Sequence, residues 1–133
     1  QKIRVSFVYV LFHSLFYFQS ESIHTQLILL FMHYLLIYDL SPDYLEKRGA
    51  HRDEHLKLAW KAENNGDLVL GGALQDPADQ AYLLFSGESP ESAIEFAKSD
   101  PYVKNGIVKS WTVRPWMTVV GDKASKKVYP DGQ

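Results

Sequence analysis

One stretch of the chain combines two arginines with a histidine at helical spacing. Arg48, Arg52, His55 and Ala59 follow one another at intervals of four, three and four residues, which places them on one face of a helix. Two guanidinium groups beside an imidazole suit an anionic ligand, and an imidazole can also transfer protons near neutral pH. The residues alone favour a simpler interpretation, an exposed helix face whose cations pair with neighbouring acidic side chains.

Asp100 is the candidate acid that could act together with a histidine. It directly precedes Pro101 at the end of a second expected helix, and a residue before proline is restricted to extended backbone. Many Asp-Pro pairs only end a helix. A carboxylate at such a corner could instead hydrogen-bond an imidazole ring and set its tautomer, which is the usual orienting role in general acid–base catalysis.

Other kinds of catalytic site find little support. The run HRDEH from His51 to His55 matches the H-x-x-E-H pattern of inverted zinc proteases. Zinc requires a third protein ligand and such a protease a deep cleft, for which the chain is very short, so we expect no metal site. We interpret His51 as a solvated or capping residue. No serine stands in a nucleophile elbow and no glycine-rich loop opens a helix, so neither acyl transfer nor phosphate binding is indicated.

The composition is that of one globular domain. The chain has 133 residues, of which 46% are hydrophobic and 23% charged, which excludes global disorder, collagen and coiled coil. The net charge of −2 is too balanced for nucleic-acid binding. No cysteine is present, so disulfides and thiolate metal sites are excluded. The aromatic content of 14% suits a small β-rich core or an aromatic-lined cleft.

Residues 1–31 differ from the rest of the chain. Basic Lys2 and Arg4 precede an apolar stretch from Val5 to Phe18, which imitates a secretory signal. The stretch is shorter than the roughly 20 apolar residues of a membrane span. Three interpretations stay open: upstream or non-native sequence, a targeting segment, or a native element packed on the domain.

A regular pattern begins at Met32, the first methionine. We therefore expect a domain over residues 32–120 and a polar, mobile tail over residues 121–133. We expect a cytoplasmic protein whose domain has no membrane partner, with organellar or secretory targeting by residues 1–31 left open.

From Met32 onward the hydrophobic periodicity alternates between that of strands and that of helices. The expected strands are Met32–Leu40, Asp67–Leu74, Gln80–Ser86 and Ile107–Thr118, and the expected helices are Leu45–Asn65 and one that begins at Pro90 after Ser89 as N-cap. This order, β-α-β-β-α-β, predicts an α+β ferredoxin-like fold with an antiparallel sheet and both helices on one face. The other face of the sheet would stay uncovered, which predicts a homodimer.

Two details of these elements bear on the site. The first helix carries apolar residues at helical spacing, while Gly49 weakens its start, so it could begin near Ala50. Its expected apolar side consists of Leu45, Leu56, Ala59, Trp60 and Ala62. In the strand that follows, Gly71-Gly72 indicates a bulge or a close backbone approach to a ligand or a partner chain.

Several segments together resemble the YciI-like family. The opening MHYLLIYD from Met32 looks like the start of such a domain, and the stretch from Arg48 to Leu56 is similar to the family's Arg-x-x-His-Leu motif. The most specific signature is the closing stretch from Asp100-Pro101-Tyr102 through Trp111 to Trp116. The resemblance spans about residues 32–116.

The resemblance implies a dimeric α+β barrel made of ferredoxin-like halves, with an active site centred on a histidine and an aspartate. By motif position these are His55 and Asp100. Some members of the family look like lyases or dehydrochlorinases that act on small ring compounds, which bears on this chain only by analogy.

We therefore expect a small enzyme without a cofactor that acts on a small organic, anionic substrate. His55 would be the general base or acid, Asp100 would orient it, and Arg52 would hold the anionic group, with Tyr102 and Trp116 lining the pocket. Two alternatives remain: a non-enzymatic module that binds a small metabolite, and a dimeric scaffold without a ligand. Heme is disfavoured because two arginines beside His55 suit anions.

Overall fold

The computed structural model describes residues 32–132 of the chain. The interpretations of residues 1–31 therefore lie outside the described part. Within residues 32–132, no helix is long and apolar enough to cross a membrane.

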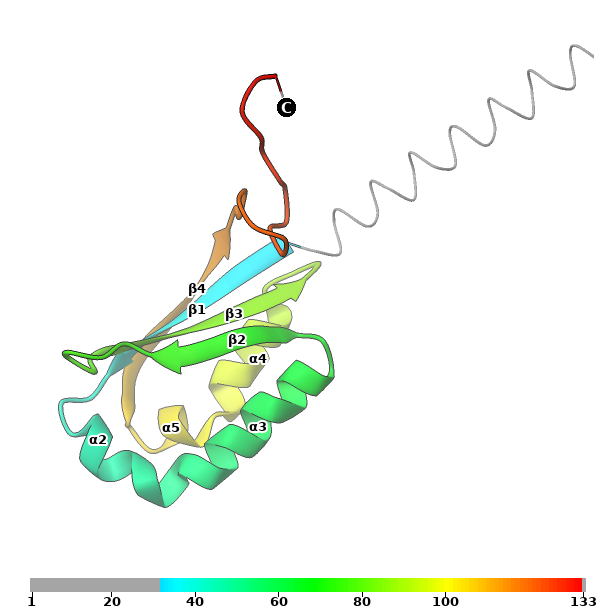
Figure 1. Cartoon of the computed structure of the whole chain (residues 1–133). Coiled ribbons are helices and arrows are strands. Elements are labelled where there is room, and N and C mark those ends of the chain that lie inside the picture. The colour runs from blue at the N-terminus through cyan, green and yellow to red at the C-terminus, as the bar shows by residue number, and fades with distance from the viewer. Residues whose placement is uncertain (1–31, 133) are drawn as a thin grey trace, which may run out of the picture.

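A four-stranded antiparallel sheet forms the centre of the fold. Its strand order is β2-β3-β1-β4, and each neighbouring pair is antiparallel. The strands are β1 (Met32–Leu40), β2 (Leu68–Ala73), β3 (Gln80–Gly87) and β4 (Val108–Trp116). The helical elements are α2 (Tyr44–Lys47), the 3-10 helix η1 (Arg48–His51), α3 (Arg52–Asn64), α4 (Glu91–Ser99) and α5 (Pro101–Lys104). All of them lie on one face of the sheet (Figure 1), which confirms the predicted α+β ferredoxin-like fold.

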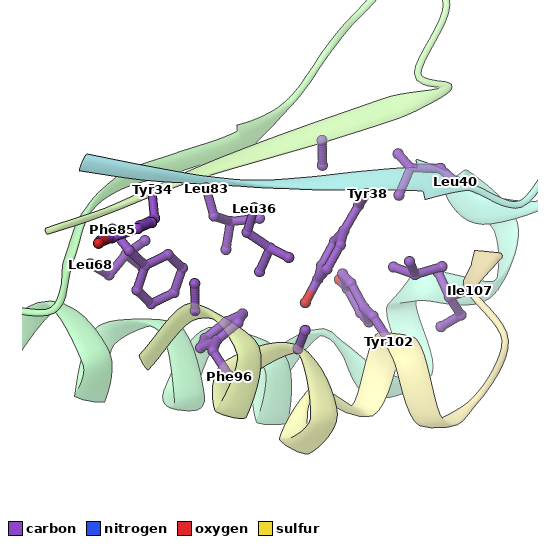
Figure 2. Packing of buried hydrophobic residues seen from close by; sticks show 14 of the residues in the cluster. Tyr34, Leu36, Tyr38, Leu40, Leu68, Leu83, Phe85, Phe96, Tyr102 and Ile107 are labelled. Carbon is purple, nitrogen blue, oxygen red and sulfur yellow. The ribbon is translucent and has the colours of Figure 1, made fainter. Parts of the chain in front are cut away.

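Alternation along β1 decides which side chains form the core. Successive residues of a strand point to opposite faces, and Tyr34, Leu36, Tyr38 and Leu40 are all at most 5% exposed. Figure 2 shows the Leu36 and Tyr38 side chains directed from the sheet toward the layer of helices, where the Tyr102 ring lies beside Tyr38. The first strand therefore presents two tyrosines, as well as leucines, to the layer of helices.

The first helical segment differs from the prediction. Instead of one helix from Leu45 to Asn65, the chain forms α2, a turn of 3-10 helix and then α3. The expected apolar side is also partly wrong, because Leu45 and Trp60 are 61% and 63% exposed. The residues that pack on the core are Leu58, Ala59 and Ala62. Periodicity identifies an apolar stripe but cannot tell a core contact from the wall of a groove.

The bulge that the sequence predicts in β2 does not lie at the glycine pair Gly71-Gly72. The irregular register lies between Leu68 and Leu70. At Gly71 an added Cβ would lie 3.1 Å from Cγ of Leu83, a contact closer than ordinary packing. Glycine at this position thus lets the core leucine of β3 approach the strand backbone.

The second helix begins one residue later than expected. Pro90 is the N-cap of α4, and the Ser89 hydroxyl accepts a hydrogen bond from the Glu91 N–H at 3.4 Å. The short helix α5 that follows Asp100 was not predicted.

Part of the segment expected to be a tail is tied back to the end of β4. The N–H groups of Lys126 and Val128 donate to the carbonyls of Thr118 and Val119. The Ser125 N–H donates to the Thr118 hydroxyl at 2.8 Å, and that hydroxyl lies 2.7 Å from Nδ1 of His33. His33, at the end of this hydrogen-bonded chain of side chains, is 5% exposed.

The burial of His33 makes stability depend on pH. Burial lowers its pKa below the ordinary value of 6.5, so the unfolded chain binds a proton more readily than the folded chain. The contribution of neutral His33 is therefore complete above pH 6.5 and is lost as the pH falls through the lowered folded value. Chemical denaturation at neutral and mildly acidic pH should show a smaller loss of unfolding free energy for His33→Gln than for the wild type. Equal losses in both proteins would contradict this account.

Candidate active site

His55 and Asp100 meet in the structure, although 45 residues separate them in the chain. Nδ1 of His55 lies 2.9 Å from Oδ1 and 3.0 Å from Oδ2 of Asp100. The imidazole comes from the first turn of α3 and the carboxylate from the junction between α4 and α5. Asp100 is fully buried, whereas the His55 side chain remains 16% exposed. The sequence-predicted pair is thus brought into hydrogen-bond contact; its chemical role remains a prediction.

Two further donors hold the Asp100 carboxylate in place. The hydroxyl of Tyr38 donates to Oδ2 at 2.8 Å, and the backbone N–H of Tyr102 donates to Oδ1 at 2.9 Å. The extended conformation of Asp100 before Pro101 makes the second bond possible, because Asp100 is the N-cap of α5. Burial and then the neighbouring Asp100 charge raise the pKa of Tyr38 far above its usual range, so this hydroxyl stays protonated and donates.

The carboxylate and two aromatic rings fix the orientation of the His55 ring. Since an ionised carboxylate only accepts hydrogen bonds, Nδ1 of His55 carries the proton and Nε2 keeps its lone pair in the neutral ring. The ring stacks on Tyr102 with centroids 3.9 Å apart and planes 6° apart. The Phe96 ring lies edge-on to the same imidazole, with the two ring centroids 6.4 Å apart. These contacts hold the imidazole in one orientation.

A pocket of about 1150 Å³ opens beside this pair, between the α2–α3 segment and the β2 side of the sheet. Four of the five predicted site residues belong to it or support it: His55, Arg52 and Tyr102 line it, and Asp100 lies behind His55. The fifth predicted residue, Trp116, lies elsewhere. It lies on β4, where it pairs with His33 of β1, at the opposite edge of the sheet from β2, and it does not line the pocket.

Positive charge gathers at one end of the pocket. Arg48 and Arg52 both line it, and Nη1 of Arg48 donates to the Tyr44 hydroxyl at 3.4 Å. The Tyr102 hydroxyl is buried and has no hydrogen-bond partner among residues 32–132. Burial, and then Tyr44, raises the pKa of this phenol, while the charges of Arg52 and Arg48 and the close approach of the Arg52 side chain act in the opposite direction. An anionic oxygen at this end would meet two guanidinium groups and an unused phenol.

Sequence reasoning missed two tyrosines of the site. Tyr38 donates to Asp100, and Tyr44 lies under the Arg48 guanidinium, whose carbon is 5.2 Å from the ring centroid. The alternation along β1 places Tyr38 on the same face as Leu36, which signals burial, but it does not reveal the carboxylate that Tyr38 meets. Within residues 32–132, no three His, Cys, Asp or Glu side chains cluster as metal ligands.

Comparison with known proteins supports a family assignment. A protein of uncharacterised function from Haemophilus influenzae is 28% identical over 97 residues, which cover 66% of this chain and 99% of that protein. Among solved structures, the 5-chloro-2-hydroxyhydroquinone dehydrochlorinase of Burkholderia phenoliruptrix, in complex with 2,5-dihydroxybenzoquinone, has a TM-score of 0.56 at 20% identity. That similarity covers 65% of this chain and 95% of the dehydrochlorinase, and it shows a shared fold. The sequence model of the YCII-related domain matches residues 32–117, and the chain therefore belongs to the YCII-related domain family.

Proposed function

We propose that this protein is a small enzyme that uses His55 for general acid–base chemistry on a small organic anion. One observation carries the proposal: His55 lines the pocket while its Nδ1 is hydrogen-bonded to a fully buried carboxylate. This arrangement leaves Nε2 as the group that exchanges a proton with a bound substrate. No cofactor is needed for such a proton transfer.

Each residue near the pair has a defined part in this mechanism. Nε2 of His55 takes a proton from the substrate, and Asp100 stabilises the imidazolium that forms and keeps its orientation. Arg52, aided by Arg48, holds the anionic group of the substrate. The Tyr102 hydroxyl is placed to donate a hydrogen bond to the same group. The proton on Nε2 then returns to the product or to water, which restores the neutral imidazole.

The dehydrochlorinase of similar fold supplies a concrete test compound. Loss of hydrogen chloride from an organic molecule needs a base that accepts the proton while chloride leaves, and His55 could be that base. The test uses purified protein with 5-chloro-2-hydroxyhydroquinone as substrate and 2,5-dihydroxybenzoquinone as binding probe. Chloride release, followed with a chloride electrode, would support the enzyme. Saturable binding of the probe without chloride release would support a small-molecule binding module for this class of compound, and no binding would exclude hydroxylated rings as ligands of the site.

We also propose that the protein is a homodimer that pairs the uncovered faces of two sheets. None of the helices in residues 32–132 covers that face (Figure 1). In the register, Leu35 pairs with Leu84 and Ile37 with Tyr82, and all four are only half-buried in the protomer. Pairing two such faces would remove these apolar side chains from water.

A charge at the centre of this face should break the dimer. Leu84→Arg would place a guanidinium between two apolar surfaces, where burial of an unpaired charge is strongly unfavourable. Light scattering after gel filtration should give the mass of a dimer for the wild type and of a monomer for the variant. Val120→Arg, at an 85% exposed position, should remain dimeric. A monomeric wild type, or a dimeric Leu84→Arg variant, would contradict the proposed interface.

A further inference from the structure

Exposed apolar side chains gather around the pocket described above. Leu45, Leu56, Trp60 and Leu74 are between 37% and 63% exposed, and all four line the pocket. Exposed leucine and tryptophan side chains that converge on one hollow indicate contact with an apolar ligand.

The apolar residues continue the arginine side of the helix. Arg52, Leu56 and Trp60 follow one another at intervals of four along α3, so they form one ridge, and each lines the pocket. The ridge thus begins at a cation, beside His55, and ends at an indole ring. Glu63 lines the pocket one turn beyond Trp60, so a second negative charge is unfavourable at that end.

The strand wall opposite this ridge consists of small residues. Gly71 and Ala73 of β2 line the same pocket and pair with Leu83 and Ala81 on the helix side of the sheet, so their small size leaves the space between α3 and β2 wide. The volume of about 1150 Å³ exceeds the range of about 300–1,000 Å³ that is common for small-ligand pockets. A single hydroxylated ring at the arginine end would leave most of this space unfilled.

The polar end has its own sign of an absent ligand. The Tyr102 hydroxyl is buried, lines the pocket and makes no hydrogen bond of ordinary geometry within residues 32–132, although the Arg52 guanidinium lies close enough to lower its pKa. An unsatisfied buried polar group is costly, and a carboxylate or enolate oxygen between Tyr102 and Arg52 would satisfy it.

We propose that the natural ligand is an amphipathic organic acid with one charged head and an extended apolar body. The inference rests on the proposed function for the position of the head, at Arg52 and Tyr102 beside His55, and adds the apolar body along Leu56 and Trp60. It names a substrate class larger and more apolar than a hydroxylated ring.

A homologous series of acids tests the body separately from the head. The affinities of butyrate, hexanoate, octanoate and decanoate for the full chain are measured by calorimetry. Burial of each added methylene should improve the affinity about fourfold. Trp60→Ser should flatten this dependence on chain length, whereas Tyr129→Ser, at an equally exposed aromatic residue outside the pocket, should preserve it. Arg52→Gln should weaken every acid by the same factor of about ten and keep the slope.

The outcomes separate the two proposals. Affinities that do not change with chain length would overturn the amphipathic ligand while leaving an anion site at Arg52. The amphipathic ligand would also be overturned if Tyr129→Ser lost the dependence of affinity on chain length as Trp60→Ser does. Decanol that binds as tightly as decanoate would overturn it too. The dicarboxylate with the length of decanoate should bind more weakly, because its second charge would approach Glu63. A wild type that binds neither any acid nor dihydroxybenzoquinone would overturn the proposed function itself.

Discussion

Replacement of His55 by alanine should reduce turnover by about 10²–10⁴-fold, the usual contribution of a positioned acid–base group. The variant removes Nε2, the atom proposed to accept the substrate proton, and leaves the pocket and its arginines in place. Steady-state rates of chloride release from the chlorinated hydroquinone, or of any reaction found for the protein, measure the loss. Binding of dihydroxybenzoquinone should persist, because Arg52 and Tyr102 remain.

A second histidine on the same segment provides the matched control. His51 lies in η1, four residues before His55, and does not line the pocket. His51→Ala should therefore retain full turnover. His55→Gln, which keeps a side-chain donor for Asp100, guards against a folding defect and should be as inactive as His55→Ala. Activity of a folded His55→Ala protein within a few-fold of the wild type would rule out His55 as the base.

Replacement of Asp100 by alanine should lower the free energy of unfolding by about 3–5 kcal/mol. The carboxylate is fully buried and satisfies the Tyr38 hydroxyl, the Tyr102 N–H and the His55 ring. Its removal leaves these donors without a partner in the interior. Denaturant unfolding measures the loss, and Asp53→Ala, at an exposed aspartate of α3, should change stability by less than about 0.5 kcal/mol.

Asp100→Asn separates stability from catalysis. The amide keeps the shape of the side chain and can still accept a hydrogen bond, so the stability loss should be smaller than for alanine. Its NH₂ group would face Nδ1 of His55 and favour the tautomer protonated on Nε2, which cannot accept the substrate proton. Turnover should therefore fall nearly as far as in His55→Ala. An asparagine variant with normal turnover would show that Asp100 only supports the fold.

Local patterns in the sequence are sufficient to predict the sheet and the backbone at Asp100, but not the contact between the two central residues of the site. The continuous apolar run over Met32–Leu40 and the strand and helix signals that follow it predict the element order, and Pro101 restricts the backbone of Asp100. The contact between His55 and Asp100 came from the family resemblance, because the spacing of Arg48, Arg52 and His55 alone favoured an exposed face.

The remaining parts of the site depend on packing across the chain. Nothing local indicates that Tyr38 meets Asp100, since that contact joins residues 62 positions apart. Periodicity alone predicts that the apolar stripe with Leu56 and Trp60 faces the core, because it does not show which strand lies opposite the helix. The sequence places Trp116 at the end of a strand but does not show where that strand lies, and the strand order puts β4 at the far edge of the sheet from β2.

The proton on the His55 ring tests the central claim most directly. Multiple-bond proton–nitrogen NMR correlations distinguish the two neutral tautomers of histidine, and the assigned His55 ring is observed with and without dihydroxybenzoquinone. The account predicts the Nδ1–H tautomer in the neutral ring of the wild type, with an Nε2 resonance that shifts when the probe binds. A neutral ring protonated on Nε2, or an Nε2 resonance unchanged by a bound probe, would contradict it.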